Sequence, residues 1–213
     1  MQPTVLIIAC LLLRVSSSPS AEPLSPIEKY RRLEFPPKEE NFEDGWKDRV
    51  AAEYDIINSA DLTSLRAALK DDDPFVRAIA AYALGVRSDG TSADALAELV
   101  KNDKEYVVRI RAIEALALLK MNPEVIESAK KDPDPGVPFV VRLVAGQIKS
   151  ETDYAAEIRQ AYAKGIDRES MGTAMVGKAA PDFTALTIDG KPFQLSSVLG
   201  KKPIAIYFTA FDG

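Results

Sequence analysis

Apolar side chains recur at helical spacing through the middle of the chain. A first stripe consists of Leu62, Leu65, Ala68 and Leu69, and a matching stripe follows as Ala93, Leu96, Leu99 and Val100. This spacing places each set on one face of a helix. Asp61 stands directly before the first stripe, where its carboxylate can cap the helix. Helices of two or three turns are too short to persist alone, so we expect them to pack in pairs.

A second helix follows each of these stripes. Asp73-Pro74 supplies a capping carboxylate and then a proline at the first helical position, where the missing N–H costs nothing. We expect Gly85 to end this helix as a left-handed residue. Asn122-Pro123 opens a further helix in the same way, and an amphipathic pattern predicts one more over residues 153–164.

The helix pairs form an internal repeat. Val76-Arg77 recurs as Val108-Arg109 and more loosely as Val141-Arg142, so 32 residues separate the first two arginines and 33 the next two. The third copy carries an insertion around residues 136–138. Three such units are the usual minimum for a stable stack, because each unit buries its apolar face only against its neighbours. We therefore predict a mainly α protein, with a solenoid of helix pairs over residues 45–165.

These repeats resemble the HEAT-repeat family, in its short-repeat subtype, over about residues 60 to 150. The family pattern is an acidic loop followed by Pro-x-Val-Arg-x-x-Ala-x-x-Ala-Leu-Gly, and residues 73–85 match it nearly completely. Ankyrin repeats have a similar period, but their signature contains histidine, which this chain lacks, and the tetratricopeptide pattern is absent. The resemblance implies a scaffold that recognises a protein partner through its repeat surface.

The repeated arginines Arg77, Arg109 and Arg142 allow two interpretations. As a ladder with one arginine per repeat, they could bind an extended acidic partner. Alternatively, they could hydrogen-bond to acidic loops of the chain itself, such as residues 71–73. We favour the second, because periodic charge beside periodic acid points first to internal pairing.

The amino-terminal region has the layout of a signal peptide and a linker. An apolar run over residues 5–13, too short to span a bilayer, precedes small residues, so we expect residues 1–20 to be an export signal cleaved after Ser20 rather than a buried core segment. Residues 21–44 are rich in proline and charge, which predicts an extended linker. A helix should then cover residues 45–57, and we place Trp46 at the edge of a core rather than in a ligand site.

The helical pattern ends before residue 177. Apolar and polar residues then alternate over residues 183–188 and 191–195, on either side of Asp189-Gly190, which is a strong hairpin signal. Residues 203–209 form a nearly continuous apolar run, typical of a strand buried on both faces. We predict a separate β-rich segment over residues 177–213.

This segment resembles the opening of a redoxin domain, the thioredoxin-like α/β group that includes peroxiredoxins. The matching elements, in order, are Gly177-Lys-Ala-Ala-Pro-Asp-Phe183, Asp189-Gly-Lys191, Leu195-Ser196, Gly200-Lys-Lys-Pro203 and the strand that follows. In that family a catalytic cysteine comes directly after the strand, but here the sequence reads Thr209-Ala-Phe-Asp-Gly213. The expectation is an incomplete redoxin segment, either truncated or serving as a cap for the repeats.

Composition narrows the chemistry further. The 213 residues include no histidine and one cysteine, Cys10, which lies in the expected signal. Histidine-dependent hydrolysis, histidine metal sites and an intrachain disulfide are therefore excluded. The net charge of −5 argues against a nucleic-acid partner, whose recognition needs a basic face.

Two functions follow from these features. The first is an exported, periplasmic or extracellular interaction module, which binds a protein partner and carries an inactive redoxin segment. The alternative is that the sequence is the front of a thiol-dependent oxidoreductase, with the repeats as a docking domain. We predict no catalytic, cofactor-binding or metal-binding residue, no cofactor, and no membrane span once the signal is removed.

Overall fold

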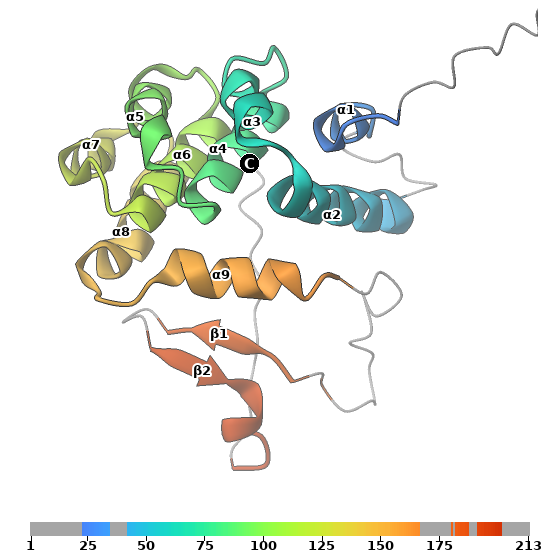
Figure 1. Ribbon diagram of the computed structural model, residues 1–213. Coiled ribbons are helices and arrows are strands. Elements are labelled where there is room, and N and C mark those ends of the chain that lie inside the picture. The colour runs from blue at the N-terminus through green and yellow to red at the C-terminus, as the bar shows by residue number, and fades with distance from the viewer. Residues whose placement is uncertain (1–22, 35–41, 167–179, 181, 188–190, 202–213) are drawn as a thin grey trace, which may run out of the picture.

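The protein is mainly α-helical, as predicted. The computed structural model describes residues 23–34, 42–166, 180, 182–187 and 191–201. Its α-helices in these ranges are α1 (Pro26–Arg31), α2 (Phe42–Ser59), α3 (Leu62–Ala68), α4 (Pro74–Val86), α5 (Ala93–Asn102), α6 (Tyr106–Leu119), α7 (Pro123–Ser128), α8 (Gly136–Lys149) and α9 (Tyr154–Ala163). Two short strands follow, β1 (Thr184–Leu186) and β2 (Pro192–Gln194) (Figure 1).

The repeats form two layers of helices. The second helices of the pairs, α4, α6 and α8, pack side by side in one layer. The first helices, α3, α5 and α7, form the other layer and pack against them (Figure 1). Small residues such as Ala80, Ala83, Ala112 and Ala115 are fully buried between the helices. They belong to one continuous apolar cluster that runs from Ile27 to Ala155. The repeats therefore share a single core, as stacking of short helix pairs requires.

The predicted helix starts are confirmed where a side chain caps the helix. Asp61 accepts a hydrogen bond from the Ser64 backbone N–H at 2.8 Å, and Asp73 accepts one from Phe75 N–H at 2.8 Å. Pro74 occupies the first position of α4. Asn122-Pro123 also precedes a helix, α7, but Asn122 has a left-handed backbone and its side chain caps nothing.

The prediction for Gly85 was wrong. Gly85 lies inside α4, which continues to Val86, and the left-handed residue after the helix is Ser88 with φ 55°. Gly85 instead faces α6: a Cβ atom at this position would lie 2.5 Å from Ala115 Cα and 2.7 Å from Ala115 Cβ. The glycine therefore permits close approach of two helix backbones.

The predicted extended linker over residues 21–44 is also wrong in part, because it contains α1. Ser25 and Glu28 form a capping box: Glu28 N–H donates to Ser25 Oγ at 3.3 Å, and Ser25 N–H donates to Glu28 Oε2 at 2.9 Å. Ile27 and Tyr30 are buried in the core, where α1 packs on α2. Burial against the neighbouring helix thus orders a six-residue helix that would not persist alone.

The predicted helix at residues 153–164 is present as α9, and it leaves the stacking direction of the repeats. It runs back to α2, where the Tyr162 and Tyr54 rings lie 4.4 Å apart between centroids. Asn58 donates to the Tyr162 carbonyl at 3.0 Å, and Arg159 Nη1 donates to the Val86 carbonyl at 2.6 Å. Helix α2, which precedes the repeats, and helix α9, which follows them, therefore contact each other.

The carboxyl-terminal segment contains the predicted hairpin. Strands β1 and β2 pair antiparallel with Thr184 opposite Gln194 and Leu186 opposite Pro192. Leu195 is buried, but it does not belong to the core cluster of the helical repeats. The expected signal peptide, the turn at residues 188–190 and the expected strand at residues 203–209 lie outside the described residues.

Candidate functional site

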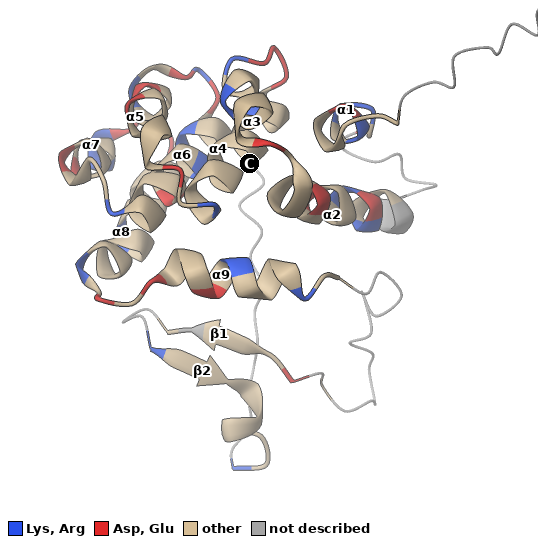
Figure 2. Ribbon diagram, in the orientation of Figure 1, with Lys and Arg blue, Asp and Glu red and all other residues tan. Residues whose placement is uncertain are grey.

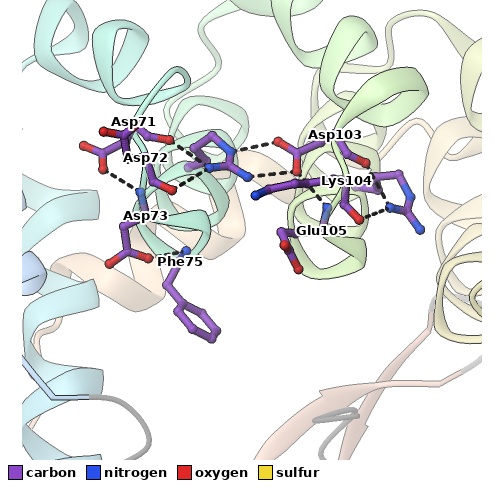
Figure 3. Close-up of polar contacts among 9 residues, drawn as sticks. Asp71, Asp72, Asp73, Phe75, Asp103, Lys104 and Glu105 are labelled. Carbon is purple, nitrogen blue, oxygen red and sulfur yellow. Dashed lines mark hydrogen bonds and ion pairs between the residues drawn. The ribbon is translucent and has the colours of Figure 1, made fainter.

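The arginine ladder is the first candidate for a binding site, but Arg77 and Arg109 pair with aspartates of the chain itself. Arg77 donates to both oxygens of Asp103, at 2.8 and 3.0 Å, and to the carbonyl oxygens of Asp71 and Asp72, at 2.8 and 3.1 Å (Figure 3). Arg109 repeats the arrangement one unit later, with both oxygens of Asp132 at 2.7 and 2.8 Å. Each arginine thus joins its own loop to the loop of the next repeat.

Helix α1 supplies an additional first member of this ladder. Asp71, Asp103 and Asp132 occupy equivalent places, since each accepts the backbone N–H of the residue two positions later. Asp71 pairs with Arg31 of α1, as Asp103 pairs with Arg77. The segment before the repeats therefore contacts their first loop through a similar arginine–aspartate pair, in which Arg31 is more exposed than Arg77.

The prediction that Arg142 belongs to the ladder was wrong. Arg142 is exposed, and its guanidinium lies 5.6 Å from the Phe139 ring centroid. The insertion explains this: Arg77 and Arg109 are the fourth residues of their helices, whereas α8 begins at Gly136 and Arg142 is its seventh residue. Three positions are nearly one helical turn, so Arg142 lies about 4.5 Å farther along its helix axis, away from the loop that the ladder arginines contact.

The ladder is a structural device rather than a binding site. The Arg77 and Asp103 side chains are 10% and 6% exposed, so the pair is closed to a partner. Burial raises the pKa of Asp103, but the hydrogen bonds from Arg77 and the Glu105 N–H, together with the positive charges of Arg77 and Arg109, outweigh it and hold that pKa below its usual range. The same balance with Arg109 lowers the pKa of Asp132. Both aspartates therefore stay ionised within their pairs.

A cleft of about 410 Å³ is lined by residues of five helices, α1, α2, α4, α6 and α8. Its aromatic and aliphatic walls comprise Tyr30, Trp46, Val50, Phe75, Ala78, Ile79, Tyr106, Val107, Ile110, Val140 and Leu143. Its charged residues are Arg49, Glu53, Arg111 and Glu114. The only tryptophan of the chain thus lines this cleft.

Arg49 holds the walls of the cleft together. Its guanidinium lies between two aromatic rings, 4.6 Å from the centroid of Tyr30 on α1 and 4.7 Å from that of Phe75 on α4. It also donates to the Tyr30 hydroxyl, and its Nε lies 3.7 Å from Glu53 Oε1. Because the Arg49 side chain is buried by these contacts, we assign it to support of the cleft rather than to ligand contact.

Arg111 is the more accessible cation of the cleft. Its Nη1 donates to Glu114 Oε2 at 3.0 Å, and its guanidinium lies 4.7 Å from the Tyr82 ring centroid. Burial lowers the pKa of Arg111, but the carboxylates of Glu114 and Glu53 outweigh it and raise that pKa. Its side chain remains 38% exposed. A permanently charged donor group therefore faces the cleft from within a mostly apolar wall.

Other kinds of site are not evident in the described part of the chain. No group of three or more acidic or cysteine side chains there is placed to hold a metal ion. None of the helices in the described ranges has the length and apolar character that crossing a membrane would need. Acidic and basic residues are interspersed along α1, α2 and α5 (Figure 2).

The repeat pattern also has a counterpart among known families. Residues 55–117 match the family of HEAT repeats. The match covers α3 to α5, the last turn of α2 and most of α6, so it includes the closely packed pair α4 and α6. Comparison with curated proteins gave no match.

Sequence reasoning missed the cleft, although one signal for it was present. Helix α6 is apolar on nearly every face, and a helix of that kind is normally buried. Arg111 and Glu114 interrupt this helix three positions apart, where their side chains can pair. Charges inside an otherwise apolar helix indicated a partly buried polar site, but its other walls come from helices far apart in sequence.

Proposed function

We propose that this protein is an interaction module in which the HEAT repeats bind a segment of a partner protein in the cleft. The observation that carries the proposal is the composition of the cleft. Its walls combine tryptophan, tyrosine, phenylalanine and arginine, and contain neither lysine nor aspartate among the described lining residues. Tryptophan, tyrosine and arginine dominate binding energies at protein interfaces, whereas lysine and aspartate are depleted there.

The position of Leu143 supports an external partner. This leucine lines the cleft on α8, yet it is 42% exposed, which is unusual for a large apolar side chain beside a core. The cleft spans several parallel helices of a repeat stack, the surface that solenoid proteins present to extended ligands. A peptide segment can follow that surface and cover Leu143.

Selection from a displayed library of random peptides tests this proposal. We expect peptides enriched on the intact chain to lose binding to a Leu143→Asp variant, because the new carboxylate would be buried by the ligand. Met121→Ser is the matched control, since Met121 is similarly exposed at 39% but lies outside the cleft. Peptides that bind both variants equally, or a failure to enrich any peptide, would count against the proposal.

The finer parts of the proposed function concern export and the redoxin-like segment. The composition of residues 1–20 supports export, and amino-terminal sequencing of secreted protein should then find Ala21 first. The motif order in residues 177–213 supports a redoxin-like segment, and the β1–β2 pairing agrees with that order. We propose that this segment is inactive in the chain of 213 residues, because thiol exchange needs a cysteine and residues 21–213 contain none.

The alternative proposal is a thiol-dependent oxidoreductase that uses the repeats for docking. It predicts that a longer form of the chain supplies the missing cysteine. Purified chain of the printed length should reduce no insulin disulfide and consume no peroxide. Turnover in either assay would contradict the proposal that the redoxin-like segment is inactive.

A further inference from the structure

The charges of the cleft balance within it. Arg49 pairs with Glu53, and Arg111 pairs with Glu114, so the four ionised side chains sum to zero. Each arginine is already paired with a glutamate beside it, so an entering carboxylate or ammonium group would meet no net charge of the opposite sign. Removal of either ion from water would then lack a compensating partner, which is costly in an apolar surrounding.

Arg111 nevertheless retains hydrogen-bonding capacity toward the cleft. A guanidinium group carries five N–H donors. Among the residues that the structure describes, Glu114 is the one hydrogen-bond acceptor of Arg111. A ligand group that accepts a hydrogen bond without carrying a charge fits this position, and the commonest such group in a protein is the backbone carbonyl.

The apolar part of the cleft lies close to this donor. Val107, Ile110 and Arg111 follow one another on α6, and Leu143 and Val140 on α8 line the same cleft. Its volume of about 410 Å³ falls in the range of sites that enclose bulky side chains or small ligands. An aromatic or aliphatic side chain would bury Trp46 and Leu143, while its own backbone lies within reach of the cleft opening.

On the basis of the proposed function, we infer that the partner segment is an uncharged stretch of peptide. It inserts an aromatic or aliphatic side chain between Trp46 and Leu143, and one of its backbone carbonyls accepts a hydrogen bond from Arg111. The arginine ladder, whose cations are satisfied internally, contributes nothing to this recognition. The chain therefore differs from a protein that binds acidic segments.

Fluorescence anisotropy with labelled, end-capped peptides from the library selection tests the inference. Peptides that carry two glutamates beside the anchor side chain, or two lysines, should both bind at least about tenfold more weakly than the uncharged parent. Arg111→Gln should weaken the parent by about tenfold, the effect of one hydrogen bond to a charged donor. Arg142→Gln, which removes an exposed arginine beside an aromatic ring outside the cleft, should leave binding unchanged.

A change in the peptide keeps the test independent of folding of the variant. Replacing the amide of the anchor residue by an ester weakens its carbonyl as an acceptor, so the ester peptide should bind the unaltered chain severalfold more weakly than the amide peptide. The ester peptide should then bind Arg111→Gln no more weakly than it binds the unaltered chain. Tighter binding of the glutamate peptides, or equal binding of ester and amide, would overturn the inference. The absence of any peptide sensitive to Leu143→Asp would instead refute the proposed function.

Discussion

Replacement of Gly85 by alanine should destabilise the protein, although the same change in an open helix stabilises it. Alanine is favoured over glycine by about 0.5–1 kcal/mol in a helix interior. At Gly85, however, the new Cβ would lie 2.5 Å from Ala115 Cα and 3.1 Å from the Ala115 carbonyl oxygen. These atoms belong to the backbone of α6, so the whole helix must move. Overpacking of this kind costs about 1–3 kcal/mol, and we expect a net loss of about 1–2 kcal/mol.

Thermal unfolding followed by circular dichroism measures this loss. At about 2–4 °C per kcal/mol, the melting temperature of Gly85→Ala should fall by about 3–6 °C. Gly90→Ala is the matched control, because the nearest atom to its new Cβ is Met121 Sδ at 3.6 Å, an ordinary contact. A Gly85→Ala protein as stable as the wild type or more so would refute close packing of α4 on α6.

Three further changes test the contacts that join the helices. Arg77→Ala should cost about 3 kcal/mol in urea unfolding, because it leaves Asp103 buried without its partner, whereas Arg142→Ala should change the stability by less than about 0.5 kcal/mol; equal effects would contradict the ladder. Tyr162→Ala should cost about 1–3 kcal/mol and speed amide hydrogen exchange in α9, and unchanged exchange would show that its ring contact with α2 is dispensable. Hydrogen bonds from Arg66 hold the pKa of Asp89 well below its ordinary value. The ionised Asp89 therefore stabilises the fold fully above its unfolded pKa of about 3.9, and this stabilisation is lost as the pH falls through the lower folded pKa. In urea unfolding below about pH 4, the free energy of unfolding should fall more steeply with pH in the wild type than in Asp89→Asn.

Local signals were sufficient to predict the repeats. Asp61 and Asp73-Pro74 act within one or two residues of the helices they start, so their roles can be inferred from the chain alone. The capping box of Ser25 and Glu28 was an equally local signal for α1, but the surrounding prolines favoured a linker. Burial of Tyr30 against α2, which a local pattern does not contain, decides in favour of the helix.

Contacts between distant residues account for what the sequence could not predict. The role of Gly85 depends on the distance to Ala115, thirty positions later, and a helix-ending glycine has the same local pattern. The insertion at the start of α8 shifted Arg142 out of register, although the Val-Arg pair itself was preserved. The cleft gathers residues from α1 to α8, so only the folded chain brings Trp46 and Leu143 into one cleft.

The emission of Trp46 tests most directly whether the cleft binds the partner segment. Trp46 is the only tryptophan in the chain, and it lines the cleft. Titration with a tryptophan-free peptide from the library selection should shift its emission to shorter wavelengths, with the same dissociation constant as the anisotropy assay, because the ligand removes the indole from water. An emission spectrum that stays unchanged while the peptide binds would contradict the assignment of the cleft as the binding site.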